Sequence, residues 1–299
     1  MGIRMSSMQS DYVRNMIREA GMWNRPLLEI RKSMEEMQSS GIPDGIRNTR
    51  ENVGGVECEV FYYEGAARDK VILYYHGGGF CLGIYPSNRD FVAGLAYRCK
   101  ADIYMPDYRL APENPYPAAL EDAARVYAGI LDRGLQPENI VIMGDSSGGA
   151  LSVSALLELK EKGIPMPKAL AYITPVFDLT GKSETIQTRR EQDPFGQEDP
   201  LSIAKIYVGE NDPTSPRLSP LFGNLNGLPP VLIHSGEYDV FSGDSEQFAR
   251  TVCLTGGEAE YKEWEEMWHI FHMQAAFVPE AELALEEMCD YIRKSLRID

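Results

Sequence analysis

The stretch 140–149, IVIMGDSSGG, carries the strongest structural signal in this 299-residue chain. Its four apolar residues predict a buried strand, and the pentapeptide from Gly144 to Gly148 matches the Gly-x-Ser-x-Gly pattern of a nucleophile elbow centred on Ser146. In such an elbow the serine occupies a sharp, strained turn, and the glycines let strand and helix pass closely because they lack a Cβ. The stretch therefore predicts a strand–turn–helix unit of an α/β fold.

A second glycine-rich motif lies upstream, again directly after an apolar run. His76, Gly77, Gly78 and Gly79 follow residues 71–75, VILYY. The motif matches the oxyanion loop of lipases and esterases, whose free backbone N–H groups face an oxygen that becomes negative during reaction. The two motifs, each in its expected context and order, together indicate a serine hydrolase more specifically than either does alone.

A serine hydroxyl needs a base within hydrogen-bond reach, because it is a poor nucleophile at neutral pH. The chain has four histidines. His76 belongs to the glycine-rich loop and His234 ends an apolar run, so the candidates for the base are His269 and His272.

An acid must also orient that base, and in this fold class it lies between the serine and the histidine in the chain, at the end of a strand. Asp239 fits this position because it follows the apolar stretch 230–234 in a polar turn. Glu237 and Asp244 are the nearest competitors.

These residues resemble the bacterial hormone-sensitive-lipase family of α/β-hydrolases. The base of that family has a His-x-Phe context, which His269 and Phe271 match and His272 does not. The resemblance covers roughly residues 50–298. Further similar stretches are 108–113 (YRLAPE), 117–122, 174–180 (TPVFDLT), 219–221, 227–230 and 239–245.

By position, the resemblance implies Ser146 as nucleophile, Asp239 as acid and His269 as base, with no cofactor and no metal. The other motif residues are expected to shape the two loops and not to react: His76, Gly77, Gly144, Asp145 and Gly148.

The resemblance also implies that the backbone N–H groups of Gly78, Gly79 and Ser147 form the oxyanion hole. Ser147 departs from the family, which usually has alanine after the nucleophile. The hole should survive this difference, because only the backbone N–H of that residue is needed.

Charge and cysteine usage exclude several classes of partner. The 29 basic and 45 acidic residues give a net charge of −16, which argues against nucleic acid and anionic membranes. Five widely spaced cysteines without a C-x-x-C pair predict reduced thiols in a cytoplasmic protein and no metal site. Charged residues throughout positions 1–20 predict neither a signal peptide nor a transmembrane helix.

Short apolar runs alternate with segments of helical period, which predicts an α/β fold with a mostly parallel, doubly wound sheet. The resemblance implies that this sheet is that of an α/β-hydrolase fold. The predicted strands are 56–63, 71–75, 102–108, 139–143, 169–174, 231–234 and 260–264. The predicted helices are 89–99, 117–132, 149–162, 245–254 and 280–296.

Two segments fall outside this alternation. Residues 1–48 have helical spacing and precede the first predicted strand, while a polar, proline-rich insert spans about 182–216. The resemblance implies that both pack together as a helical cap over the site, with the catalytic domain at 49–299.

The function expected from the motifs and the resemblance is a serine carboxylesterase for small, short-chain acyl esters, acetyl to about hexanoyl. An amidase, an arylformamidase or a deacetylase of a sugar or other small molecule would use the same residues. A receptor for small molecules on the same fold would have lost part of the triad, whereas Ser146, Asp239 and His269 are all present. A homo-oligomer is compatible with the sequence.

Overall fold

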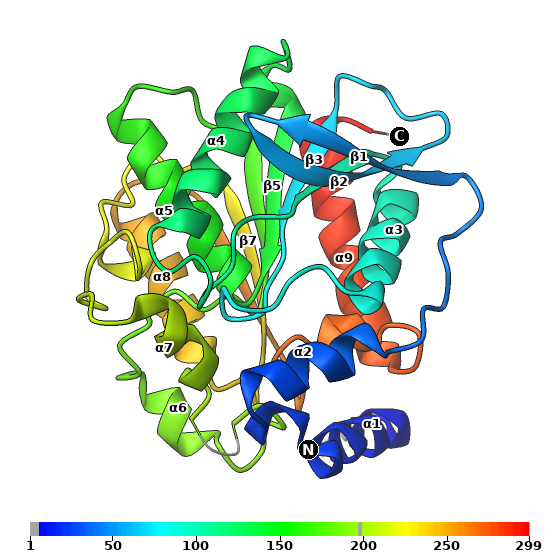
Figure 1. Cartoon of the computed structure of the whole chain (residues 1–299), viewed down its shortest axis with the longest axis vertical. Helices are drawn as coiled ribbons and strands as arrows, with labels where there is room; N and C mark the ends of the chain where they lie inside the picture. The colour runs from blue at the N-terminus through cyan, green and yellow to red at the C-terminus, as the bar shows by residue number, and fades with distance from the viewer. Residues whose placement is uncertain (1–5, 197–198, 299) are drawn as a thin grey trace.

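The computed structural model describes residues 6–196 and 199–298, which fold around one central sheet (Figure 1). Its eight strands have the order β1-β2-β4-β3-β5-β6-β7-β8. Strands β3 to β8 pair in parallel, while β2 runs antiparallel to both β1 and β4. The strands are β1 (Ile46–Val53), β2 (Val56–Tyr63), β3 (Val71–Tyr75), β4 (Asp102–Pro106), β5 (Ile140–Asp145), β6 (Ala169–Ile173), β7 (Val231–Gly236) and β8 (Ala259–Trp264). The prediction of a mostly parallel sheet is confirmed.

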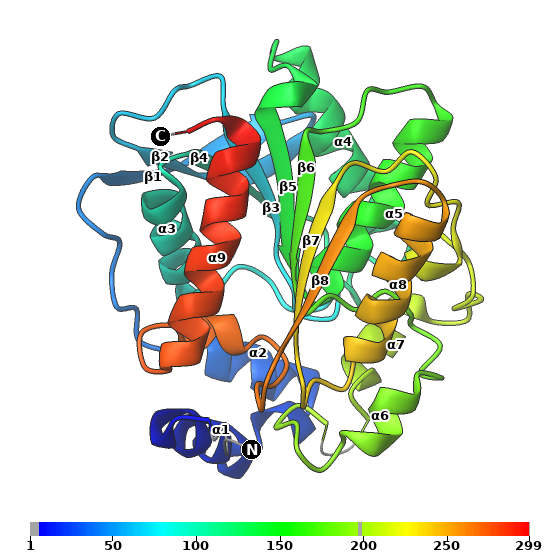
Figure 2. The same ribbon diagram turned by 180° about the vertical axis from the view of Figure 1, so that it is seen from behind.

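Helices cover both faces of the sheet, as Figures 1 and 2 show. On one face lie α3 (Pro86–Cys99) and α9 (Pro279–Leu296), and on the other lie α4 (Ala118–Asp132), α5 (Ser147–Glu161) and α8 (Ser242–Leu254). The central strands are therefore buried on both faces, which explains why they appear in the sequence as continuous apolar runs. None of the helices in residues 6–196 and 199–298 combines the length and the apolar character of a membrane span.

Every strand except β1 begins and ends within two residues of its predicted bounds, and these five helices within three. Strand β1 was missed because its sequence, IRNTRENV, has only two apolar residues and lies at an edge of the sheet. Its hairpin turn is Gly54-Gly55, whose φ values of 59° and 85° are those of a two-residue turn that favours glycine. Residues 46–48, placed by the sequence analysis before the first strand, belong to β1.

The segments outside the sheet lie at the end of the molecule where the parallel strands finish (Figure 1). The N-terminal segment contains α1 (Met8–Ala20) and α2 (Leu27–Glu35), and the insert contains α6 (Glu184–Thr188) and α7 (Ser202–Val208). Residues 1–5 of the first segment and 197–198 of the insert lie outside the described residues.

The two segments touch each other directly. The guanidinium group of Arg18 donates hydrogen bonds to the backbone carbonyls of Glu191 and Gln192, at 2.8 and 2.6 Å. The rings of Trp23 and Phe195 pack with their centroids 4.9 Å apart. Segments about 170 residues apart in the chain therefore meet over the carboxyl ends of the strands.

Candidate active site

Ser146 lies at the turn where β5 ends and α5 begins. Its φ of 50° and ψ of −125° belong to a region that residues with a side chain rarely adopt. Three backbone hydrogen bonds hold this turn: the N–H of Ser146 donates to the carbonyl of Ile173 at 3.1 Å, and its carbonyl accepts from the N–H groups of Gly149 and Val176, both at 3.0 Å. The strained serine is therefore fixed against β6 and the loop that follows it.

Glycines of both motifs lie where a side chain would meet neighbouring atoms: backbone atoms at Gly144 and Gly148, and mainly the Asp145 carboxylate at Gly77. A Cβ on Gly148 would lie 2.0 Å from the carbonyl oxygen of Tyr75, and a Cβ on Gly144 would lie 2.9 Å from the same atom. A Cβ on Gly77 would lie 2.3 Å from Oδ2 of Asp145. No side chain fits at these distances, so the glycine pattern reflects how closely β3, β5 and α5 approach one another.

The structure brings Ser146, His269 and Asp239 into one chain of hydrogen bonds. Nε2 of His269 lies 2.9 Å from Oγ of Ser146, and Nδ1 lies 3.1 Å from Oδ1 of Asp239. Asp239 follows β7, is fully buried, and also accepts the N–H of Phe241 at 2.9 Å. His269 follows β8 and is 4% exposed. The arrangement has the order of nucleophile, base and acid that acyl transfer requires.

The environment of His269 favours its protonated form. Burial alone would lower the pKa of this imidazole, but the charge of Asp239, the hydrogen bond to it and the charges of Asp193 and Asp145 outweigh burial and raise the pKa above its ordinary value of 6.5. The imidazolium that forms when a serine proton is taken is therefore stabilised in place.

The competing residues lie elsewhere. His272 is fully buried with its Nε2 3.2 Å from Nδ1 of His234, and burial and that neighbour lower its pKa well below the ordinary value. Asp244 is buried at the start of α8, where burial and the charge of Asp178 raise its pKa to about 8. Glu237 accepts a hydrogen bond from the backbone of the loop after β8.

The glycine-rich loop runs alongside the elbow. Gly78 and Gly79 have φ values of 107° and 62°, which few other residues adopt. The N–H of Gly79 donates to Oγ of Ser147 at 2.8 Å. Within residues 6–196 and 199–298, no acceptor lies in hydrogen-bond range of the N–H of Gly78 or of Ser147. Two of the three expected donors are thus free, and the third is engaged by a side chain.

Asp145 and His76 support this loop from behind. Oδ1 of Asp145 accepts the N–H of Gly77 at 2.9 Å and the hydroxyl of Tyr74 at 2.6 Å. His76 is fully buried, stacks on Tyr108 with ring centroids 4.2 Å apart, and has its pKa lowered to about 4 by burial. Asp145 thus contacts the loop from the elbow, and His76 anchors the start of the loop against Tyr108.

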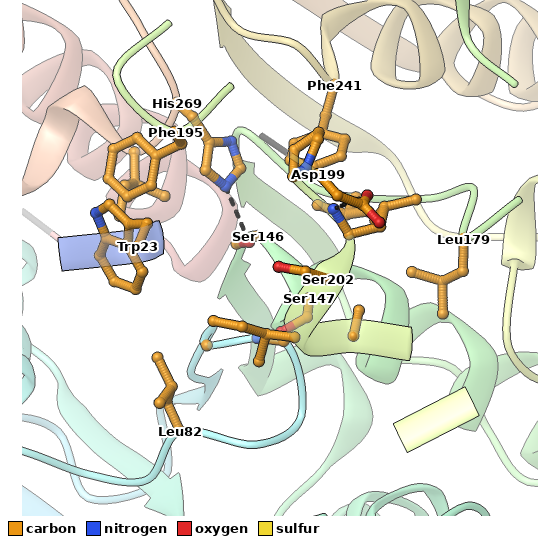
Figure 3. Close-up of a pocket in the computed structure, with 18 of the residues that line it drawn as sticks. Trp23, Leu82, Ser146, Ser147, Leu179, Phe195, Asp199, Ser202, Phe241 and His269 are labelled. Atoms are coloured by element: carbon orange, nitrogen blue, oxygen red, sulfur yellow. Dashed lines mark hydrogen bonds between the residues drawn. The ribbon is translucent and has the colours of Figure 1, made fainter. Parts of the chain in front are cut away.

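A pocket opens around Ser146, and its walls come from several segments (Figure 3). Trp23 comes from the N-terminal segment, Phe195 from the insert and Phe241 from the loop after Asp239. Phe195 and Phe241 meet the His269 ring edge-on, with centroid distances of 5.5 and 5.0 Å. Other apolar residues complete the lining: Leu82, Val176, Leu179, Leu201 and Ile203.

Neither these wall residues nor Asp193 can be recognised as site residues from the sequence. Asp193 is fully buried in the insert, where its carboxylate accepts the N–H groups of Phe195 and Val240 at 2.9 and 3.0 Å. Burial and the charge of Asp239 raise the pKa of Asp193 to about 7. Its position in a polar insert gave no signal, because no residue pattern relates it to the distant loop that it contacts.

Comparisons with known proteins agree with this geometry. A family model described as the alpha/beta hydrolase fold matches residues 72–273. An acetyl-hydrolase of Streptomyces hygroscopicus is 33% identical over 264 residues, which are 88% of this chain and 87% of that protein. An esterase of Acinetobacter venetianus is 34% identical over 233 residues, covering 76% of this chain and 75% of its own.

Solved structures of esterases also resemble this chain closely in fold and to a similar extent in sequence. The crystal structure of an esterase from the bacterial hormone-sensitive lipase family superposes with a TM-score of 0.91 at 33% identity, covering 98% of this chain and 100% of the other. The structure of EstE5 soaked with p-nitrophenyl butyrate gives a TM-score of 0.92 at 32% identity with the same coverage. The chain belongs to the bacterial hormone-sensitive-lipase family of α/β-hydrolases. The predicted enzyme class, a carboxylic ester hydrolase, is thereby confirmed.

Proposed function

We propose that this chain is a serine carboxylesterase that hydrolyses small esters of short acyl groups, acetyl to about hexanoyl, through an acyl-enzyme on Ser146. The observation that carries the proposal is the hydrogen-bond chain from Ser146 Oγ through the His269 ring to Asp239 Oδ1, at 2.9 and 3.1 Å. It is supported by the adjacent loop, whose Gly78 and Gly79 line the same pocket, and by the N–H groups of Gly78 and Ser147, which have no hydrogen-bond partner among the described residues.

In acylation, Oγ of Ser146 attacks the ester carbonyl carbon while Nε2 of His269 takes the hydroxyl proton. The carbonyl oxygen becomes negative and is held by the oxyanion hole of Gly78, Gly79 and Ser147. The bond to the leaving alkoxide then breaks, and the imidazolium returns the proton to it, which releases the alcohol. Asp239 keeps the ring tautomer with its proton on Nδ1 and stabilises the imidazolium.

In deacylation, a water molecule takes the place of the alcohol. His269 removes a proton from that water as its oxygen attacks the acyl carbon, and a second oxyanion forms in the same hole. The bond to Ser146 Oγ breaks, the serine regains its proton from His269, and the carboxylic acid leaves. No metal or cofactor is needed for either step.

The N-terminal segment and the insert act as the cap that limits substrate size. Their supporting observation is the contact between Trp23 and Phe195, which places two aromatic rings in the wall of the pocket beside His269. An aromatic wall close to the base favours short acyl groups. The acetyl-hydrolase relative and the butyrate ester used with EstE5 point to the same substrate range.

The test is hydrolysis of 4-nitrophenyl esters from acetate to laurate by the wild type and by Ser146→Ala at neutral pH. We expect turnover that depends on Ser146 and peaks between acetate and hexanoate. A panel of matched 4-nitroanilides and acetylated sugars runs in parallel, and faster turnover of these would identify an amidase or a deacetylase. Folded wild type without turnover on either panel would favour a receptor.

A further inference from the structure

The N–H of Gly79 does not point into open space. It donates a hydrogen bond to Oγ of Ser147 at 2.8 Å, although this N–H is one of the three expected oxyanion donors. Ser147 is 2% exposed and lines the pocket next to Ser146 (Figure 3). An alanine at this position could not make this bond.

The bond restricts where an oxyanion can sit. A hydrogen bond of 2.8 Å places the Ser147 oxygen in front of the N–H group of Gly79, where an oxyanion bound to Gly79 would also have to lie. Either the Ser147 hydroxyl swings away when the oxyanion forms, or it stays and the oxyanion binds next to it. The first alternative breaks a hydrogen bond during the reaction, whereas a site that stabilises a transition state works best without such rearrangement.

A Ser147 hydroxyl that keeps its hydrogen bond from Gly79 can still donate its own proton. It has one proton and two lone pairs, and Gly79 uses one lone pair. Within the described residues, no acceptor for the Ser147 proton is found. A donor that itself accepts a hydrogen bond is polarised and becomes a better donor. The N–H of Gly79 thus strengthens the O–H of Ser147.

We propose that the hydroxyl of Ser147 is a catalytic donor of the oxyanion hole and transmits the contribution of Gly79. The negative oxygen would then be held by the N–H groups of Gly78 and Ser147 and by the O–H of Ser147. The inference rests on the proposed function, because it concerns the oxyanion formed when Ser146 attacks an ester. It adds a side chain to a hole that was expected to consist of backbone alone.

The first test compares Ser147→Ala and Ser147→Gly with wild type on 4-nitrophenyl butyrate. Both variants lack the hydroxyl and leave the backbone N–H in place. We expect kcat to fall about 10- to 100-fold in both, somewhat less than for complete loss of a donor, because water partly replaces the hydroxyl. Ser152→Ala is the matched control: Ser152 is buried on the same helix and bonds Gly149 and Tyr172, away from the pocket. It should keep wild-type kcat.

The second test measures inhibition by a butyl trifluoromethyl ketone and by the corresponding methyl ketone. The fluorinated ketone adds to Ser146: the Oγ–C bond forms, the serine proton passes to His269, and the ketone oxygen becomes an oxyanion. Ser147→Ala should raise the inhibition constant of the fluorinated ketone about 10-fold or more. The inhibition constant of the methyl ketone should stay within about twofold of the wild-type value.

The outcomes separate this inference from the proposed function. If Ser147→Ala matches or exceeds wild type in kcat and in affinity for the fluorinated ketone, the hydroxyl only occupies the Gly79 N–H and the inference is wrong. If Ser146→Ala keeps activity, or binds the fluorinated ketone as tightly as wild type, the proposed function itself fails. Equal melting temperatures of the variants and wild type ensure that folding does not cause the difference.

Discussion

The elbow around Ser146 and the pocket wall formed by Trp23 and Phe195 are stabilised by different kinds of contact. At the elbow, backbone meets backbone: a Cβ on Gly148 would lie 2.0 Å from a main-chain oxygen of the neighbouring strand's end. In the cap wall, side chains make the contacts, with Trp23 packing on Phe195 and Asp193 bonding the loop after Asp239. The elbow admits one residue type at its glycine positions, whereas the wall can be built from many combinations of side chains.

This difference explains why the reacting residues can be predicted from sequence patterns and the pocket walls cannot. A backbone contact below 3 Å can be met only by glycine, so the reacting groups stand inside patterns that recur. Pocket walls carry no such constraint, and here they come from segments far apart in the chain. The chemistry should therefore fail abruptly when the elbow or triad is changed, and substrate choice should shift gradually when the wall is changed.

The largest loss of activity is expected when the proposed base, His269, is replaced. His269→Ala should lower kcat on 4-nitrophenyl butyrate roughly 10⁴-fold or more, because no other base in the part of the chain that the structure describes is hydrogen-bonded to Ser146 Oγ. His272→Ala is the matched control and should stay within about tenfold of wild type, since His272 pairs with His234 and not with Ser146. Steady-state kinetics measures both, and the reverse ranking would move the base to His272.

The next effect tests the steric claim at the elbow. Gly148→Ala should lower the free energy of unfolding by about 3 kcal/mol, because its methyl group would overlap the carbonyl of Tyr75. Gly94→Ala is the control: it also lies in a helix, α3, but has nothing within 4 Å of its added Cβ, so a gain of about 0.5–1 kcal/mol is expected. Denaturant titration measures both. Equal stability changes would show that close backbone approach does not explain the motif.

A smaller effect is expected on the pKa of His269 from the buried carboxylate of Asp193 in the insert. His269 must be neutral to act as base, so kcat/KM should fall as pH drops through a midpoint above 6.5. The charge of Asp193 helps to raise this pKa, together with those of Asp239 and Asp145, so Asp193→Asn should move the midpoint to lower pH. The pH profile of kcat/KM measures this shift. Glu210→Gln, an exposed change in the same insert, should leave the midpoint in place, and an unmoved midpoint in Asp193→Asn would contradict the coupling.

The smallest effect concerns acyl length. Phe195→Ala should enlarge the pocket and raise the ratio of kcat/KM for the octanoate ester to that for the butyrate ester a few-fold, roughly the gain expected for added apolar contacts. Activity on acetate should change less than tenfold. Phe222→Ala removes an aromatic ring that is 45% exposed outside the pocket and should leave the ratio unchanged. An unchanged ratio in Phe195→Ala would show that Phe195 of the insert does not limit the length of the acyl group.

Much of the fold could be predicted because its central strands are buried on both faces and interrupted by glycine-rich turns. Strand β1 could not, since an edge strand needs few apolar residues. At the site, Ser146 was readable from its glycines, and Asp239 and His269 from their place after strands and from the resemblance. The hydrogen bond from Gly79 to Ser147 could not be foreseen, because it depends on how a loop and a side chain are oriented in space.

Covalent labelling can identify the nucleophile of this enzyme. The enzyme is treated with diethyl 4-nitrophenyl phosphate, and the modified residue is located by peptide mass spectrometry. We predict one diethylphosphoryl group per chain on Ser146, with loss of ester hydrolysis in proportion to labelling and no label in Ser146→Ala. A label on another residue, or full hydrolysis by Ser146→Ala, would contradict Ser146 as the nucleophile.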